Sequence, residues 1–216
     1  MRKIKAVIFD LGSTLIKQKR IHRLFLNKKY NINLPREKYA KMFSDIFFTK
    51  SWNNLEDGFK LFAEEYGTKN DKRFISDMKK IFKNDHKNYV TFRATIPLLK
   101  WLKVKKYKIG LISNASQKCR AILDYHKLTP YFHVICISAE QKKRKPDVRL
   151  FRYVIKHLKV KPSEVLMVGD KDWADYAPAK ELGMHALLIE RKKKRYSHSI
   201  RNLRQVKTYL ECIERH

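Results

Sequence analysis

The chain has 216 residues, of which 50 are Lys or Arg and 21 are Asp or Glu, so its formal net charge is +29. Hydrophobic residues make up 44% of the sequence, which excludes a disordered chain and is enough for a sizeable buried core. The positive charge favours anionic partners, such as phosphorylated molecules, nucleic acid or acidic membrane surfaces, without choosing among them. The length allows one large domain or a core with a smaller insertion.

The sequence carries no sign of secretion or membrane insertion. The apolar run after the basic start Met1–Lys5 ends at Asp10, which is too early for a secretory signal. No stretch approaches the roughly 20 apolar residues of a spanning helix. The three cysteines, Cys119, Cys136 and Cys212, form no C-x-x-C pair, and an odd count favours a reducing compartment. We therefore expect a soluble cytoplasmic protein, whose oligomeric state the sequence leaves open.

A buried strand is predicted at Lys5–Phe9, where five residues form a short apolar run. From about Arg20 to about Asp85 the apolar residues recur at helical spacing instead, which predicts a bundle of amphipathic helices. Asn54 as N-cap and Gly67 as a stop signal frame one of these helices. The predicted apolar faces are Ile21, Leu24 and Phe25; Tyr39, Met42, Phe43, Ile46 and Phe47; Leu55, Phe59, Phe62 and Tyr66; and Phe74, Ile75, Met78, Ile81 and Phe82.

From Thr95 onward, predicted helices and strands alternate, which is typical of a parallel sheet with helices on both faces. The predicted helices are 97–104, 116–128, 148–158 and 175–182, and the predicted strands are 109–112, 133–137, 165–168 and 186–189. A last helical pattern, from Ile200 to Ile213, is expected to pack back on the core. The sequence thus predicts an α/β fold with a Rossmann-like, three-layer core (residues 1–16 and 90–216) and an all-helical cap (residues 17–89).

Polar residues stand at the ends of four predicted strands. Asp10 ends the first strand, Ser113 and Asn114 end the second, Lys145 follows the third, and Asp170 and Asp175 follow the fourth. Because parallel strands end at one edge of a sheet, these side chains can converge. Taken singly, each has an ordinary explanation as a turn residue, a helix cap or a surface lysine. The order of all four at successive strand ends favours a functional site.

The residue types fit phosphoryl transfer. The Asp10 carboxylate can attack phosphorus and form an acyl-phosphate, which divides hydrolysis into two easier steps. Asp170 and Asp175 can hold Mg²⁺, which prefers hard oxygen ligands. Ser113 and the N–H groups at the start of the next helix can bind phosphate oxygens. Lys145 can neutralise the negative charge that the nucleophile and the phosphoryl group bring together.

Over nearly its whole length the chain resembles the haloacid dehalogenase-like hydrolase superfamily, in its phosphatase-rich branch with a helical cap between the first two motifs. The first motif, D-x-D-x-T, aligns on Asp10 and Thr14; the second on Ser113; the third on Lys145; and the fourth, G-D-x-x-x-x-D, on Gly169, Asp170 and Asp175. The resemblance implies a Mg²⁺-dependent phosphomonoesterase acting on a small phosphorylated metabolite. It implies Asp10 as nucleophile, Lys145 as catalytic and phosphate-binding residue, Ser113 and Asn114 as phosphate-binding residues, and a metal held by Asp10, the Gly12 carbonyl, Asp170 and Asp175.

One departure from the family pattern concerns the acid–base step. Gly12 stands where the phosphatases of this family carry a second aspartate, which protonates the leaving group and then activates water. General acid–base help of this kind contributes about 10²–10⁴-fold to a rate. The backbone carbonyl at this position is retained, so we expect the metal site to suffer less than the turnover. We therefore expect a slow phosphatase, or one that recruits an acid or base from elsewhere.

Two other functions compete with this interpretation. The first is a dehalogenase, which the acidic pair Asp170 and Asp175 makes the weaker alternative. The second is a catalytically weakened binding or regulatory protein, with RNA or another polyanion as partner because of the +29 charge. Nucleic acid is not favoured, because no platform of exposed aromatic residues is predicted near the site. Trp52–Asn54, between two predicted helices of the cap, could reach a substrate. The basic runs at 17–20, 142–145 and 191–195 are expected to be solvated surface, except that Lys142–Arg144, next to the predicted site, could focus a positive field on an anionic substrate.

Overall fold

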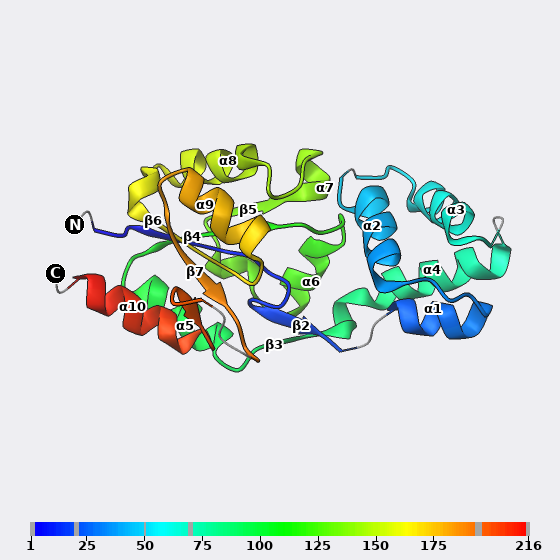
Figure 1. Cartoon of the computed structure of the whole chain (residues 1–216), viewed down its shortest axis with the longest axis horizontal. Helices are drawn as coiled ribbons and strands as arrows, with labels where there is room; N and C mark the ends of the chain where they lie inside the picture. Colours follow the sequence, from blue (N-terminus) through cyan, green and yellow to red (C-terminus); the bar gives the residue numbers. More distant parts are fainter. Residues whose placement is uncertain (1–2, 20–21, 50, 69–70, 193–195, 215–216) are drawn as a thin grey trace.

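The computed structural model describes residues 3–19, 22–49, 51–68, 71–192 and 196–214 (Figure 1). Its centre is a six-stranded sheet in the order β5-β4-β1-β6-β7-β8, in which every neighbouring pair of strands is parallel. The strands are β1 (Ala6–Phe9), β4 (Lys108–Ser113), β5 (Val134–Ile137), β6 (Val165–Gly169), β7 (His185–Ile189) and β8 (Ser199–Ile200).

Helices cover both faces of this sheet. Alternate residues of β1 explain the two layers, because Val7 and Phe9 belong to one buried apolar cluster and Ala6 and Ile8 to the other. The first cluster includes residues of α5 (Thr95–Val104), α6 (Cys119–Tyr125) and α10 (Arg204–Glu214), and the second includes residues of α8 (Val148–Leu158) and α9 (Ala177–Glu181). The predicted α/β fold with a parallel sheet in three layers is confirmed.

The described residues between 22 and 88 form a helical insert with an apolar cluster of its own, rich in packed aromatic rings such as Phe47, Phe62 and Phe74. It contains α1 (His22–Tyr30), α2 (Arg36–Phe47), α3 (Leu55–Tyr66), α4 (Lys72–Asn84) and the 3₁₀ turn η1 (Asp85–Asn88). The predicted caps of α3 are confirmed: Asn54 accepts a hydrogen bond from the Glu56 N–H, and Gly67 adopts a left-handed conformation with φ of 92°.

Two short strands connect the insert to the sheet. β2 (Ile16–Gln18) pairs antiparallel with β3 (Tyr89–Thr91), so the chain leaves and re-enters the core side by side (Figure 1). These strands lie at the boundaries that the sequence places at residues 17 and 89. The periodicity did not predict them, because strands of three residues are too short to display an alternation.

Some predicted elements were wrong in detail. On α1, Leu24 and Phe25 are about half exposed and Leu26 is buried, because residues spaced by four along the helix, Leu26 and Tyr30, face the insert's apolar cluster. Ile21, also assigned to that face, lies outside the described residues, as do residue 20 and residues 193–195 of the basic runs. The predicted helix 116–128 is shorter, α6, and the predicted helix 175–182 begins as a π-helical turn, η4 (Asp172–Tyr176), before α9. β8 was not predicted.

The remaining short elements join these layers: α7 (Ser138–Gln141), η2 (Thr129–Tyr131) and η3 (Pro162–Glu164). Within the described part of the chain, no helix has both the length and the apolar character that crossing a bilayer requires. Cys119 and Cys136 are buried free thiols, and Cys212 is an exposed one.

Candidate active site

The carboxyl ends of three adjacent strands bring the predicted residues to one edge of the sheet. Phe9 on β1 lies beside Leu111 on β4 and Val168 on β6, so Asp10, Ser113 and Asp170 follow at the same edge. The Asp10 N–H extends the ladder by donating to the Val168 carbonyl at 3.0 Å. The parallel sheet therefore places these three residues at one edge, where the sequence predicts that they converge.

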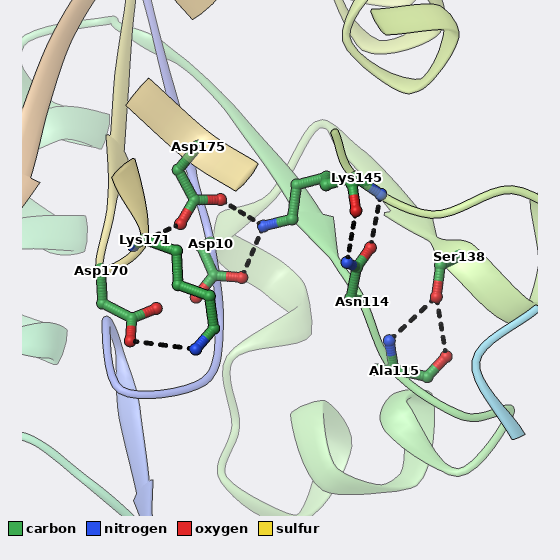
Figure 2. Close-up of polar contacts among 8 residues, drawn as sticks. All are labelled: Asp10, Asn114, Ala115, Ser138, Lys145, Asp170, Lys171 and Asp175. Carbon is green, nitrogen blue, oxygen red and sulfur yellow. Dashed lines mark hydrogen bonds and ion pairs between the residues drawn. The ribbon is translucent and has the colours of Figure 1, made fainter. Parts of the chain in front are cut away.

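Lys145 lies between two carboxylates. Its Nζ donates to Asp10 Oδ1 at 2.7 Å and to Asp175 Oδ1 at 2.5 Å (Figure 2). The lysine side chain is only 2% exposed. A buried ammonium is stable only where opposite charges and hydrogen bonds offset the loss of its hydration, and here two carboxylates do so. One lysine among the 50 basic residues is thus singled out by its surroundings.

Asn114 holds the backbone of Lys145. Its Nδ2 donates to the Lys145 carbonyl at 3.0 Å, and its Oδ1 accepts from the Lys145 N–H at 2.7 Å. The side chain amide is therefore engaged with the protein in this structure, and its phosphate-binding role stays a prediction. Ser113, predicted to bind the phosphoryl group, is buried at the end of β4. Ser138 joins the same loops by accepting from the Ala115 N–H at 3.0 Å (Figure 2).

Asp175 is fixed by the turn that carries it. Its Oδ2 accepts the Lys171 N–H at 3.0 Å, while its Oδ1 accepts from Lys145. Gly169 leaves the room that the Asp175 carboxylate occupies, because a Cβ atom on residue 169 would lie 2.3 Å from Asp175 Cγ. The glycine of the fourth motif is thus required by close packing of the carboxylate against the backbone.

The donor set fits a hard divalent cation. One oxygen each from Asp10, Asp170 and Asp175 can be chosen so that all three lie within 4.8 Å of one another. Both oxygens of Asp175 already accept hydrogen bonds, whereas Asp10 Oδ2 receives none from a described residue. No described residue donates to the Gly12 carbonyl either. Carboxylates, a carbonyl and bound waters are the ligands that Mg²⁺ takes in proteins, so the residues present fit the predicted metal.

Burial, together with the neighbouring acids, raises the pKa values of the carboxyl groups of Asp10 and Asp170. Burial raises the pKa of Asp10 to about 7, with Asp175 and Asp170 adding to the rise and Lys145 opposing it. Burial also raises the pKa of Asp170. For Lys145, burial favours the neutral form, but the Asp10 and Asp175 carboxylates outweigh it and raise the pKa of the ammonium. Burial and mutual repulsion disfavour the ionised forms of these carboxyl groups. A bound cation would offset both effects, so this environment favours cation binding.

The helical insert contacts the core beside this site. Arg144 donates to Asp45 Oδ1 at 2.8 Å and also to Ser44, both on α2. Gln117, in the loop after β4, accepts from the Trp52 N–H at 2.5 Å and donates to the Trp52 carbonyl at 3.1 Å. The Trp52 indole turns into the insert and donates to the Ile46 carbonyl, so this side chain does not reach toward a substrate as the sequence suggested.

Sequence reasoning missed two residues of this region. Lys171 donates its N–H to Asp175, and the side chain of Gln117 connects the insert to the core. Neither a lysine in so basic a chain nor a single glutamine carries a recognisable spacing signal. Arg144 belongs to the predicted run Lys142–Arg144, but the sequence did not show that its guanidinium donates to Asp45 and Ser44 on α2.

Comparison with known proteins supports the same family. The model of the haloacid dehalogenase-like hydrolase family matches residues 7–189. The chain is 28% identical over 211 residues to a glyceraldehyde 3-phosphate phosphatase of Methanocaldococcus jannaschii, covering 86% of this chain and 85% of that one. It is 36% identical over 121 residues to the rhythmically expressed gene 2 protein of Drosophila melanogaster, which covers 55% of this chain and only 44% of the fly protein.

Solved structures show the same fold. A haloacid dehalogenase-like phosphatase from Thermococcus onnurineus superposes with a TM-score of 0.71 at 26% identity, covering 96% of this chain and 98% of that one. A 2-haloacid dehalogenase from Pseudomonas syringae has the same TM-score at 21% identity, covering 97% of this chain and 99% of that one. The second likeness concerns the fold alone. With a family model that spans most of its length and four motifs gathered at one sheet edge, the chain belongs to the haloacid dehalogenase-like hydrolase family.

Proposed function

We propose that this hydrolase is a Mg²⁺-dependent phosphatase that acts on a small phosphorylated metabolite through a phosphorylated Asp10. The observation that carries the proposal is the position of Lys145, whose buried ammonium joins the carboxylates of Asp10 and Asp175 next to Asp170. A nucleophile, a cation for the phosphoryl charge and two further acids are the parts that phosphoryl transfer requires.

In the proposed first step, a carboxylate oxygen of Asp10 bonds to phosphorus as the bond between phosphorus and the substrate's alcohol oxygen breaks. The alcohol leaves and takes a proton from solvent. Water then attacks the phosphorus of the Asp10 acyl-phosphate, which releases inorganic phosphate and returns the carboxylate. Lys145 stays within hydrogen-bonding distance of Asp10 and offsets negative charge in both steps.

A Mg²⁺ ion, when bound, would supply further positive charge against the phosphoryl oxygens. Asp10, Asp170 and the Gly12 carbonyl would hold it, with Asp175 supporting the set through Lys145 and the Lys171 N–H. Ser113 and the N–H groups that follow it would bind phosphoryl oxygens. The helical insert would act as a cap that covers the substrate and excludes water.

Gly12 points to slow turnover. With no carboxylate at this position, the leaving alcohol and the attacking water both lack the acid–base group found in related phosphatases. Substrates with good leaving groups would then be preferred. Two archaeal relatives are named glyceraldehyde 3-phosphate phosphatase. Phosphorylated metabolites about as small as glyceraldehyde 3-phosphate are therefore the first substrates to test.

The test is a phosphate-release screen over a panel of phosphorylated metabolites, including glyceraldehyde 3-phosphate, with Mg²⁺ and with EDTA. We expect release from at least one ester that requires Mg²⁺ and is lost in Asp10→Asn. An exposed-site variant, Asp57→Asn on α3, is the matched control and should retain activity. Release that persists in Asp10→Asn would contradict the proposal.

The missing acid–base residue and the +29 charge favour one second candidate, a catalytically weakened protein that binds a polyanion such as RNA. Binding to RNA that survives moderate salt, in a protein that releases no phosphate from any ester of the panel, would support it over the phosphatase.

A further inference from the structure

Arg191, just beyond β7, donates hydrogen bonds to the turn that follows the candidate nucleophile Asp10. Its Nη1 donates to the Ser13 carbonyl at 2.7 Å, and its Nη2 donates to the Thr14 carbonyl at 2.8 Å. Ser13 adopts a left-handed conformation with φ of 59°, which a non-glycine residue takes only when its surroundings hold it there. The guanidinium fork thus fixes two successive carbonyls of a turn with an uncommon backbone shape.

The same guanidinium stacks on Phe92. Its Cζ lies 3.6 Å from the centre of the Phe92 ring. A planar guanidinium gains from such stacking while its edge N–H groups remain free to donate, which an ammonium cannot match. Phe92 comes directly after β3, so Arg191 contacts both the turn after Asp10 and the segment by which the chain returns from the helical insert.

Further hydrogen bonds tie these two segments together. The Phe92 N–H donates to the Leu15 carbonyl at 3.0 Å, and the Thr95 hydroxyl donates to the same carbonyl at 2.7 Å. With the two bonds from Arg191, the carbonyls of Ser13, Thr14 and Leu15 are all held by residues outside the turn. Gly12, whose carbonyl is a proposed metal ligand, lies between this fixed stretch and Asp10.

We infer that Arg191 is a positioning residue, which sets the conformation of the turn 11–14 and thereby the placement of the Asp10 carboxylate and the Gly12 carbonyl. This inference rests on the proposed phosphatase function for its effect on rate, but not for its effect on the turn. A small displacement of a reacting group can cost about 10²-fold in rate, so loosening this turn lowers kcat more than it changes substrate affinity.

The experiment compares Arg191→Ala, Arg191→Lys and the neighbouring, exposed control Lys192→Ala. Hydrogen exchange of residues 11–16 is measured without metal or substrate, where the Ser13 and Ile16 N–H groups bond to the Ile16 and Leu11 carbonyls. Hydrolysis of para-nitrophenyl phosphate and its Mg²⁺ dependence are measured in parallel. We expect faster exchange, a kcat lower by about 10- to 100-fold and a higher Mg²⁺ requirement in Arg191→Ala.

Arg191→Lys keeps the charge but loses the fork and the stacking, so it should remain close to Arg191→Ala, whereas Lys192→Ala should match the wild type. Unchanged exchange at residues 11–16 in Arg191→Ala, or full rescue by Arg191→Lys, would overturn the inference. If Arg191→Ala does not fold, Phe92→Leu removes the stacking surface and should accelerate the same exchange. If the wild type hydrolyses no ester, the proposed function fails, and the exchange measurement still decides the role of Arg191.

Discussion

Asn114 and Lys145 are joined by two hydrogen bonds that run in opposite directions, from the amide nitrogen to the Lys145 carbonyl and from the Lys145 N–H to the amide oxygen. The amide of Asn114 therefore pairs with a backbone segment as a neighbouring strand would. This pairing sets where the lysine side chain starts and so lets its ammonium reach Asp10. The pairing thus connects the end of β4 to the loop that carries Lys145, although Asn114 and Lys145 are 31 residues apart in the sequence.

Asn114→Asp tests this coupling. The aspartate can still accept from the Lys145 N–H, but it faces the Lys145 carbonyl with an oxygen in place of a donor. Loss of one hydrogen bond costs about 0.5–1.5 kcal/mol, and the opposed oxygens add to the loss. We expect a lower Tm and a lower kcat with Lys145 still present. Asn33→Asp, the same change at an exposed position before α2, should alter neither value; equal stability of the two variants would contradict the coupling.

Gly12→Asp should restore an acid–base group. A Cβ atom at Gly12 meets no other heavy atom within 4 Å, so the side chain can be accommodated without displacing its neighbours. We expect phosphatase turnover to rise by about 10²–10⁴-fold, measured as kcat on an alkyl phosphate with a poor leaving group. Gly12→Asn matches the size without the acid and should give no such rise. A correctly folded Gly12→Asp with unchanged kcat would argue against the proposed cause of slow turnover.

Gly169→Ala should displace Asp175. The added Cβ would lie 2.3 Å from the Asp175 Cγ atom, so the carboxylate must move and Lys145 loses one of its two partners. Overpacking of this kind costs about 1–3 kcal/mol in the free energy of unfolding. Thermal unfolding should show a lower Tm for Gly169→Ala, while Gly12→Ala, which has open space for its methyl group, should unfold near the wild-type temperature. Equal Tm values for the two variants would show that Asp175 adapts freely.

The pKa of Asp10 predicts a titration near neutrality. Burial raises this pKa from 3.8 to about 7 in the protein without metal, and the neighbouring acids contribute. The unfolded chain therefore binds fewer protons between these two values, so this group stabilises the fold below pH 3.8 and loses that contribution as the pH rises through 7. Carboxyl ¹³C NMR should show the midpoint near 7, and Asp170→Asn should lower it because a negative charge is removed. A midpoint near 4 in the metal-free wild type would contradict this electrostatic picture.

The sequence was a good guide where physical periodicity is strong. The five longer strands of the sheet are apolar runs of four to six residues, and a polar residue stands at or just after the end of each. The predicted edge that carries Asp10, Ser113 and Asp170 therefore followed from topology. The spacing of the aromatic residues likewise predicted the faces of α2, α3 and α4. These patterns are visible in the sequence because burial favours apolar residues at every inward-facing position of an element.

Other features depend on single tertiary contacts and could not be predicted. The sequence of α1 allows either Leu24 or Leu26 to face the insert's apolar cluster. Only the packing of α1 against the other helices decides that Leu26 is the buried one. Arg191 stands at the start of a basic run that resembles solvated surface, yet its guanidinium binds backbone carbonyls 177 and 178 residues away. The side chain of Asn114 looked free to bind phosphate, because nothing in the local sequence shows that the Lys145 backbone lies opposite.

The most direct test of the central claim is chemical trapping of the phosphorylated residue. The protein is mixed with para-nitrophenyl phosphate and Mg²⁺, quenched within the first turnover and reduced with borohydride, which converts an aspartyl-phosphate to homoserine. Peptide mass spectrometry then locates the modified residue. We predict homoserine at position 10 in the wild type and in Gly12→Asp, and none in Asp10→Asn. Phosphate release without modification at position 10, or with modification at another residue, would contradict the account.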